Sequence, residues 1–173
     1  MSKRVETKQK ILAAAWRLFA ENGYENTTTR QIAREAGVAD GTVFSHFETK
    51  LAILRDGMLN RLEQISEQVL SAETGKSAEE LGMALIDKYY RYYFDNVGLS
   101  RALLKEVIWD LDYYELFDQT LFKNTNSASS LTGKMPVIMD AYFMTLIRHL
   151  SQPEPNVDAA LSELHMKIRT ILE

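Results

Sequence analysis

Two short helical segments on either side of one glycine constrain this chain more than any other stretch. Thr28 and Gln31 stand three residues apart, as the two members of a capping box do at the start of a helix. Gly37 follows where a helix can end in the left-handed conformation at little steric cost. A second helix is expected over residues 40–47. Two short helices joined by a glycine-containing turn predict a helix-turn-helix unit.

A longer helix is expected immediately before this unit, over residues 6–22. Its apolar side chains recur at helical spacing and would form one broad face: Ile11, Leu12, Ala15, Trp16, Leu18 and Phe19. Gly23 follows where that helix would end. Together the three helices predict a compact head. In such a head the second helix of the helix-turn-helix unit enters the major groove of DNA.

The remainder of the chain also has a helical period, so the expected fold class is all-α. Only three prolines are present, and no useful stretch alternates apolar and polar residues as a strand would. A second capping box at Ser77 and Glu80 starts one of the later helices. Further helices are expected over residues 50–72, 78–96, 101–109, 111–123, 135–150 and 157–172, with a polar loop over 124–134.

Several short motifs of the head fall in the order and spacing of the tetracycline-repressor (TetR) family. They are Asn22-Gly23-Tyr24, Thr27-Thr28-Thr29, Ile32-Ala33, Ala36-Gly37-Val38, the run from Gly41 to Phe47, and Lys50. The chain resembles that family over about residues 8–55. The resemblance implies a helix-turn-helix DNA-binding domain over residues 1–49 and an all-helical ligand-binding and dimerisation domain over residues 50–173.

The resemblance also implies which side chains contact DNA. Thr29 and Arg30 open the first helix of the unit and look like phosphate or base contacts. Lys50, at the start of the following helix, looks like a phosphate clamp. Contacts of this kind position a protein on the DNA backbone, whereas contacts with base edges specify sequence. The full candidate set is Thr28, Thr29, Arg30, Gly41, Thr42, Phe44, Ser45, His46 and Lys50.

Within the expected recognition helix, Thr42 and His46 look like phosphate contacts by the same resemblance. Ser45 occupies the variable position that usually faces bases. Gly41 leaves the start of the helix bare, so that the backbone can approach DNA closely.

The chain departs from the family pattern at several positions in this region. Family members often have a hydroxyl or basic residue where this chain has Ala39 and Asp40. Phe44 replaces the usual tyrosine and therefore lacks a hydroxyl that could reach a phosphate. Asp40 and Glu48 place negative charge near the DNA backbone. We therefore expect modest, salt-dependent DNA affinity.

Charge is divided unevenly along the chain. The net charge is −4, but residues 1–50 contain eight Lys or Arg and six Asp or Glu, whereas residues 51–173 contain twelve and eighteen. A slightly positive head on an acidic body suits DNA binding by the head alone, although the positive charge is small.

Aromatic residues are concentrated in the second half of the chain. Ten of the seventeen lie between residues 81 and 122. Within residues 89–94 every residue except Arg91 is aromatic. They could line a ligand pocket or simply pack as a core. A pocket would suit a flat hydrophobic effector, cationic if the acids of residues 106–118 face it. The candidate ligand-binding residues are Met58, Leu62, Tyr89, Tyr90, Tyr93, Trp109, Tyr113, Phe117 and Tyr142.

The last two expected helices carry more apolar surface than one chain can cover. Residues 135–150 are apolar over more than half of the helix circumference, and residues 157–172 have apolar residues at heptad-like spacing. This pattern favours a homodimer through a four-helix contact, with a closed monomer core as the alternative.

Other features exclude several kinds of site. The chain has no cysteine, and its three histidines are widely separated, so no metal site or cofactor is expected. No secretory leader or membrane span is expected, which predicts a cytoplasmic protein without a membrane partner.

The sequence thus predicts a ligand-responsive transcriptional regulator, with a repressor as the favoured form, that binds a palindromic DNA operator as a homodimer. An interaction factor on the same fold, with little sequence specificity, is one alternative. An enzyme using Glu106 and Asp110 as acid and base is the other, although the chain has no nucleophile, metal or phosphate-loop motif.

Overall fold

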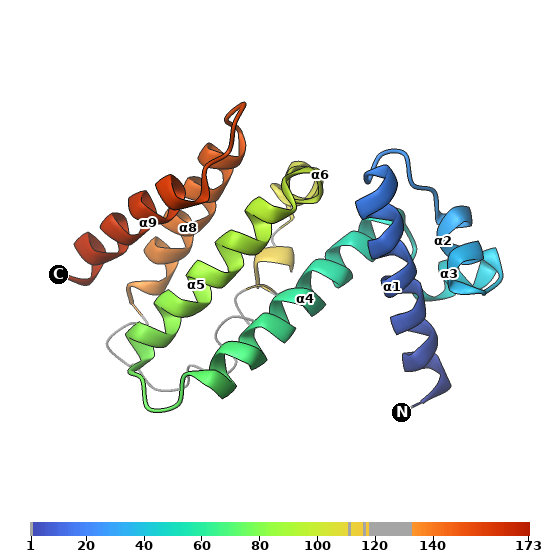
Figure 1. The fold of residues 1–173 in the computed structure, drawn as a ribbon, viewed down its shortest axis with the longest axis horizontal. Coiled ribbons are helices and arrows are strands. Elements are labelled where there is room, and N and C mark those ends of the chain that lie inside the picture. The colour runs from blue at the N-terminus through green and yellow to red at the C-terminus, as the bar shows by residue number, and fades with distance from the viewer. Residues whose placement is uncertain (1, 111, 116, 118–132) are drawn as a thin grey trace.

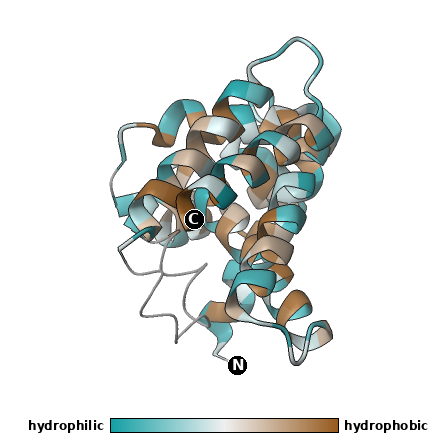
Figure 2. Ribbon diagram, turned by 90° about the vertical axis from the view of Figure 1, so that its left-hand side faces the viewer, coloured by the Kyte–Doolittle hydropathy of each residue, from teal (hydrophilic) through white to brown (hydrophobic). Residues whose placement is uncertain are grey.

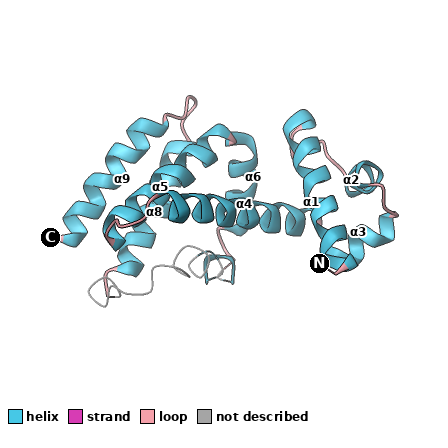
Figure 3. Ribbon diagram, turned by 60° about the horizontal axis from the view of Figure 1, so that its bottom comes forward, coloured by secondary structure: helices cyan, strands magenta, loops and turns pink. Residues whose placement is uncertain are grey.

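The computed structural model describes residues 2–110, 112–115, 117 and 133–173. The predicted all-α class is confirmed, since this part of the chain forms helices and no strand (Figure 3). The helices are α1 (Lys3–Asn22), α2 (Thr29–Ala36), α3 (Asp40–His46), α4 (Lys50–Ala72), α5 (Ala78–Asp95), α6 (Val97–Val107), α8 (Met135–Leu150) and α9 (Val157–Leu172). None of these helices is long and apolar enough to cross a membrane.

The helices form two groups joined by α4. Figure 1 shows α1, α2 and α3 gathered at one end of α4, whereas α5, α8 and α9 lie alongside its other part. We call residues 2–49 the head and the helices from α5 onward the body. The N-terminus lies at the head end and the C-terminus at the opposite end, on α9.

Local capping explains most helix boundaries. Both predicted capping boxes are confirmed, at Thr28 before α2 and at Ser77 before α5. The bounds predicted for α4, α8 and α9 are also confirmed. Helix α1 begins at Lys3 rather than at residue 6, because the side chain of Ser2 caps it by accepting a hydrogen bond from the backbone of Val5.

Both ends of α6 were also predicted wrongly, and one element lies mostly outside the described residues. Helix α6 begins at Val97 rather than at residue 101, since Asn96 ends α5 and directly precedes α6. Of the helix expected over 111–123, residues 112–115 and 117 are described and are helical. The loop expected over 124–134 is described only at residues 133 and 134, which form a turn.

The head has its own apolar core. Most of the predicted apolar face of α1 is buried and packs with side chains of α2 and α3; the fully buried members are Ile11, Ala15, Ile32, Ala33 and Val43. Gly37 ends α2 with φ 68°, as the sequence predicted. Two ion pairs hold α1 in place from outside: Arg17 with Glu35 of α2 at 2.8 Å, and Lys8 with Asp56 of α4 at 2.6 Å.

Helix α4 belongs to both groups. Its buried apolar residues continue along almost its whole length: Ile53, Leu54, Met58, Leu59, Leu62, Ile65 and Val69. Near the start it packs on α1, where Gly57 lies directly beneath the indole of Trp16. A Cβ atom at Gly57 would overlap the Trp16 ring, so any larger residue here would force the indole aside.

The body ends in the helix pair α8 and α9. Glu163 of α9 links the two helices by pairing with His149 of α8 at 2.8 Å. It also pairs with Lys167 of its own helix. The hydrogen bonds from Lys167 and His149 lower the pKa of Glu163 to about 2, so the carboxylate stays ionised at neutral pH. Figure 2 looks at this end of the molecule and shows hydrophobic and hydrophilic residues alternating along the helices.

The Gly57 crossing predicts opposite effects for alanine at two helical glycines. At Gly82 of α5 an added Cβ meets nothing within 4 Å, so Gly82→Ala should stabilise the protein by about 0.5–1 kcal/mol through helix propensity. Gly57→Ala gains the same propensity but forces the Trp16 indole aside. It should therefore be less stable than Gly82→Ala by about 1–3 kcal/mol in urea unfolding. Equal stability of the two variants would show that α1 and α4 do not interlock here.

Candidate functional site

Helix α3 presents one face to solvent and buries the other. Val43 and Phe47, the latter just past the end of α3, are buried against the head. On the opposite side Gly41, Phe44 and Ser45 are exposed, and the Phe44 ring is 53% exposed despite its apolar character. An exposed aromatic ring on a short helix of this kind is available for contact with a partner. The predicted recognition face is therefore accessible.

The remaining candidates on α2 and α3 lie around this face. Arg30 is exposed, while Thr29, Thr42 and His46 are half-buried. Thr28 has a structural task, because its hydroxyl caps α2 by accepting a hydrogen bond from the Gln31 backbone at 3.2 Å.

Asp40 does not stand alone at the start of α3. Its Oδ2 accepts a hydrogen bond from Nε of Arg30 at 3.1 Å, and both side chains are largely exposed. The pair connects the first turn of α2 with the first turn of α3. The pair neutralises the negative charge of Asp40, one of the residues that depart from the family pattern. It also engages Arg30, which the resemblance to the family gives as a DNA contact.

Ser45 also makes a local hydrogen bond. Its Oγ donates to the Thr42 carbonyl at 2.8 Å, one turn earlier in α3. The hydroxyl oxygen keeps its acceptor capacity, so Ser45 can still accept a hydrogen bond from a base amino group.

The Lys50 side chain does not extend freely into solvent, as the predicted role of phosphate contact would suggest. Its ammonium donates to the carbonyls of Tyr24 and Glu25, at 2.7 and 3.3 Å, and lies 4.2 Å from the centre of the Tyr24 ring. Lys50 therefore fastens the start of α4 to the loop between α1 and α2. An ammonium has three donors, so one remains for a phosphate once these two bonds are made.

The Arg30–Asp40 pair predicts that Asp40→Asn strengthens DNA binding. The substitution removes an anion and releases Arg30 toward a phosphate. Affinity at low salt should rise several-fold, and the slope of log K against log salt should steepen by about one. Fluorescence anisotropy with labelled duplex DNA measures both.

Glu35→Gln is the matched control, because Glu35 forms an exposed ion pair with Arg17 elsewhere in the head. It removes the same charge without releasing Arg30. If Glu35→Gln strengthens binding as much as Asp40→Asn does, Arg30 has no part in DNA contact.

Eight of the nine candidate ligand-binding residues belong to one buried cluster in the body. All are at most 1% exposed: Met58, Leu62, Tyr89, Tyr90, Tyr93, Tyr113, Phe117 and Tyr142. Ring centres of Tyr90 and Phe117 lie 5.1 and 5.5 Å from that of Tyr142. We call these eight residues the aromatic cluster.

Trp109, the ninth candidate, lies outside the aromatic cluster. Helix α6 ends at Val107, and Trp109 lies in the turn that follows, where its side chain is 90% exposed. A residue past the helix end leaves the buried face of that helix. Phe143 of α8 was missed, although its ring centre lies 4.9 Å from that of Phe117. Its place in the apolar run of residues 135–150 was the available signal.

The hydroxyl groups of the aromatic cluster differ in their partners. Tyr89 shares a hydrogen bond with Ser66, and Tyr90 donates to the Tyr142 carbonyl at 2.6 Å. The Tyr142 hydroxyl is fully buried and makes no hydrogen bond of good geometry among the described residues, although the Tyr93 hydroxyl lies close to it. Burial raises the pKa of Tyr93 and of Tyr142 well above 10, so both are neutral at physiological pH.

The described acids of residues 106–115 lie outside the aromatic cluster. Glu106, Asp112 and Glu115 are exposed, and Asp110 pairs with Arg55 of α4 at 2.8 Å. These positions favour the interpretation in which the acids are solvated. An uncharged hydrophobic ligand suits the aromatic cluster better than a cation does.

The environment of the Tyr142 hydroxyl predicts that its removal does not destabilise the protein. A buried hydroxyl without a partner costs about 1–3 kcal/mol, so Tyr142→Phe should leave stability unchanged or raise it. Tyr90→Phe, the matched control, deletes an existing hydrogen bond and should lower stability by about 1 kcal/mol. Urea unfolding of both variants measures the difference. A clear destabilisation by Tyr142→Phe would mean that its hydroxyl is hydrogen-bonded.

An exposed recognition face on a three-helix head, joined by one helix to a helical body, defines the architecture of a helix-turn-helix regulator. Residues 11–56 match the family model described as bacterial regulatory proteins, tetR family. The resemblance to the TetR family is thereby confirmed.

Similarity to known proteins also extends over the whole chain. The transcriptional repressor AcnR of Corynebacterium efficiens is 25% identical over 99% of this chain and 80% of its own length. Three relatives of 31–36% identity, among them the fatty acid metabolism regulator protein of Bacillus subtilis, align over 46–60% of this chain and 37–42% of their own length.

Two structures that were solved with a bound ligand share the fold. FadR of Thermus thermophilus, a TetR-family repressor in complex with lauroyl-CoA, superposes with a TM-score of 0.76 at 22% identity, covering 96% of this chain and 93% of that one. FadR of Bacillus subtilis with stearoyl-CoA gives 0.55 at 22% identity, covering 92% and 97%.

Proposed function

We propose that this protein is a DNA-binding transcriptional repressor that a hydrophobic small molecule releases from its operator. The observation that carries the proposal is the solvent-facing surface of α3 in a head that matches the family model. AcnR, a relative that aligns over nearly the whole chain, is named a repressor, and this supports repression rather than activation. Action on chromosomal DNA would place the protein in the cytoplasm.

We divide the chain functionally at residue 50. Residues 1–49 would be the DNA-binding domain and residues 50–173 the ligand-binding and dimerisation domain. Lys50 lies at the division and is bonded to the head, while the later part of α4 packs in the body. Helix α4 is then the element through which either domain affects the other.

A homodimer would form through α8 and α9. Val137 and Met144 of α8 and Met166 of α9 are each more than half exposed, although all three are large and apolar. Val137 and Met144 stand seven residues apart and share a helix face. Pairing with a second copy would bury these side chains in a four-helix contact. Two heads would then read half-sites about 34–36 Å apart.

The proposed ligand class is a molecule with a long acyl chain. The two FadR proteins were solved with lauroyl-CoA and stearoyl-CoA, and the aromatic cluster of this chain is apolar with neutral hydroxyls. An acyl chain would enter among these rings, with the Tyr142 hydroxyl available to a polar atom of the ligand. No nucleophile or metal site enters this proposal, which assigns binding rather than catalysis.

Release of DNA would require two arrangements of the head relative to the body. Met58 and Leu62 lie on α4 and in the aromatic cluster, so a ligand that pushes on them also pushes on α4. The ligand shifts the population only if it binds one arrangement more tightly than the other. In a dimer this movement would change the distance between the two recognition helices.

Selection of bound sequences from a random DNA pool tests the proposal. We expect a palindromic consensus with half-sites about one helical turn apart. Lauroyl-CoA and stearoyl-CoA should then weaken binding to the selected duplex by about tenfold or more, whereas free coenzyme A should not. A consensus that is bound equally with and without acyl-CoA would reject the ligand class, and binding without any consensus would favour an interaction factor of low specificity.

A further inference from the structure

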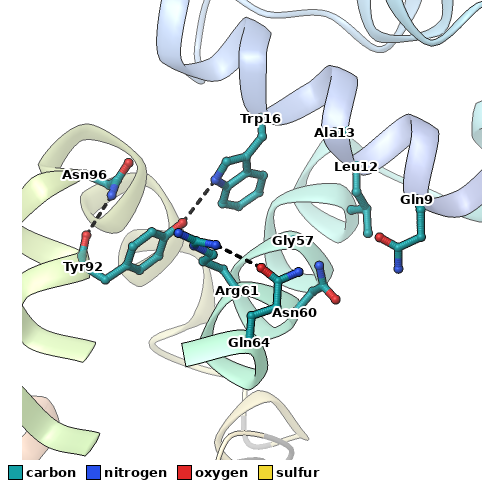
Figure 4. A pocket seen from close by; sticks show the side chains of 10 residues that line it. All are labelled: Gln9, Leu12, Ala13, Trp16, Gly57, Asn60, Arg61, Gln64, Tyr92 and Asn96. Atoms are coloured by element: carbon teal, nitrogen blue, oxygen red, sulfur yellow. Dashed lines mark hydrogen bonds between the residues drawn. The ribbon is translucent and has the colours of Figure 1, made fainter. Parts of the chain in front are cut away.

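A cleft of about 370 Å³ lies between the head and the body, lined by residues of α1, α4 and α5 (Figure 4). Met58 and Leu62 of the aromatic cluster are not among its lining residues, although they lie on the same helix. The cleft therefore differs in position from the ligand pocket proposed above. Its volume is near the lower end of the range for small-molecule sites, which is about 300–1,000 Å³.

The lining combines one cation with amides and two aromatic rings. Arg61 of α4 is the only charged residue among those that line the cleft. Its guanidinium lies 5.8 Å from the centre of the Tyr92 ring and donates to the side-chain carbonyl of Gln64 at 3.0 Å. Asn60 and Gln9 add further amide groups that can donate or accept hydrogen bonds.

The two rings come from different groups of helices. Trp16 belongs to the head and Tyr92 to the body, and the indole N–H donates to the Tyr92 hydroxyl at 3.1 Å (Figure 4). Gly57 forms part of the floor, where α1 crosses α4. A molecule in this cleft would therefore touch both groups of helices at the point where they meet.

We propose that this cleft is a second effector site, selective for small planar carboxylates of one or two rings. A carboxylate would pair with the Arg61 guanidinium, whose planar array of donors matches two oxygens at once. The planar part would lie against Trp16 and Tyr92, and the amides would bind polar substituents. The volume excludes a complete acyl-CoA, so the class differs from the ligand of the aromatic cluster.

The effect on DNA rests on the function proposed above. A ligand that bridges Trp16 and Arg61 stabilises whichever arrangement of head and body keeps these residues together. Because coupling between two ligands is reciprocal, DNA would change the affinity for the carboxylate by the same factor as the carboxylate changes the affinity for DNA.

The two tryptophans of the chain make the site directly observable. Trp16 lines the cleft and Trp109 lies exposed elsewhere, so a two-dimensional ¹H–¹⁵N spectrum has one indole signal from each. Trp109→Phe assigns the Trp16 signal by elimination. Titration with benzoate and nicotinate should shift that signal, whereas the uncharged benzamide and nicotinamide should bind about tenfold more weakly or worse.

Arg61→Gln should reduce benzoate affinity by about tenfold or more. Arg91→Gln is the matched control, since Arg91 is an exposed arginine of α5 paired with Asp87. A Trp16 signal that no carboxylate moves would overturn the proposal. Equal binding of benzoate and benzamide would also overturn it, as would undiminished benzoate binding to Arg61→Gln.

This experiment needs no DNA and no acyl-CoA, so it separates the two proposals. Carboxylate binding in the absence of any selected operator would keep the cleft as a site and reject only its effect on transcription. A selected operator that acyl-CoA releases, with no shift of Trp16 by carboxylates, would keep the proposed function and reject the second site.

Discussion

The close crossing of α1 over α4 is the constraint on which the arrangement of the molecule depends. The crossing is this close because position 57 is a glycine, since the Trp16 indole occupies the space where a Cβ would stand. It fixes the depth at which the head sits on α4 and places the Trp16 N–H within 3.1 Å of the Tyr92 hydroxyl. The same indole thus packs on the shared helix and reaches the body, so the head cannot rotate about α4 without breaking one of these contacts.

Four of the eight lysines and arginines of residues 1–50 bind partners within the head or at its junction with α4. Arg17 pairs with Glu35, Lys8 with Asp56, and Arg30 with Asp40, while Lys50 binds two loop carbonyls. The small positive charge seen in the sequence is therefore not all directed at DNA. Exposed pairs of this kind add little stability each, so an approaching phosphate can compete for their cations at modest cost. DNA affinity then depends on exchanging internal partners for phosphates as much as on net charge.

The sequence predicted what depends on neighbouring residues along the chain and missed what depends on distant ones. Capping boxes predicted the starts of α2 and α5, and the helical period predicted the bounds of α4, α8 and α9. Eight of the nine candidate pocket residues are buried together. The partners of Lys50 and the role of Trp16 were missed, because those contacts join residues 26 and 76 positions apart. Trp109 was misplaced because the end of α6 at Val107 carries no glycine or proline signal. The cleft has no sequence signature, since three separate helices line it.

The aromatic side chains of α5 face in different directions, and this connects the aromatic cluster with the cleft. Tyr89, Tyr90 and Tyr93 are buried in the aromatic cluster, whereas Tyr92 turns toward the head and meets Trp16. A single helix therefore contributes to both candidate ligand sites from two of its faces. Because the buried rings and Tyr92 belong to one packed helix, a ligand that displaced those rings would alter the position of the Tyr92 hydroxyl as well. The two proposed ligands would in this way act on the same contact between head and body, one from the core and one from the surface.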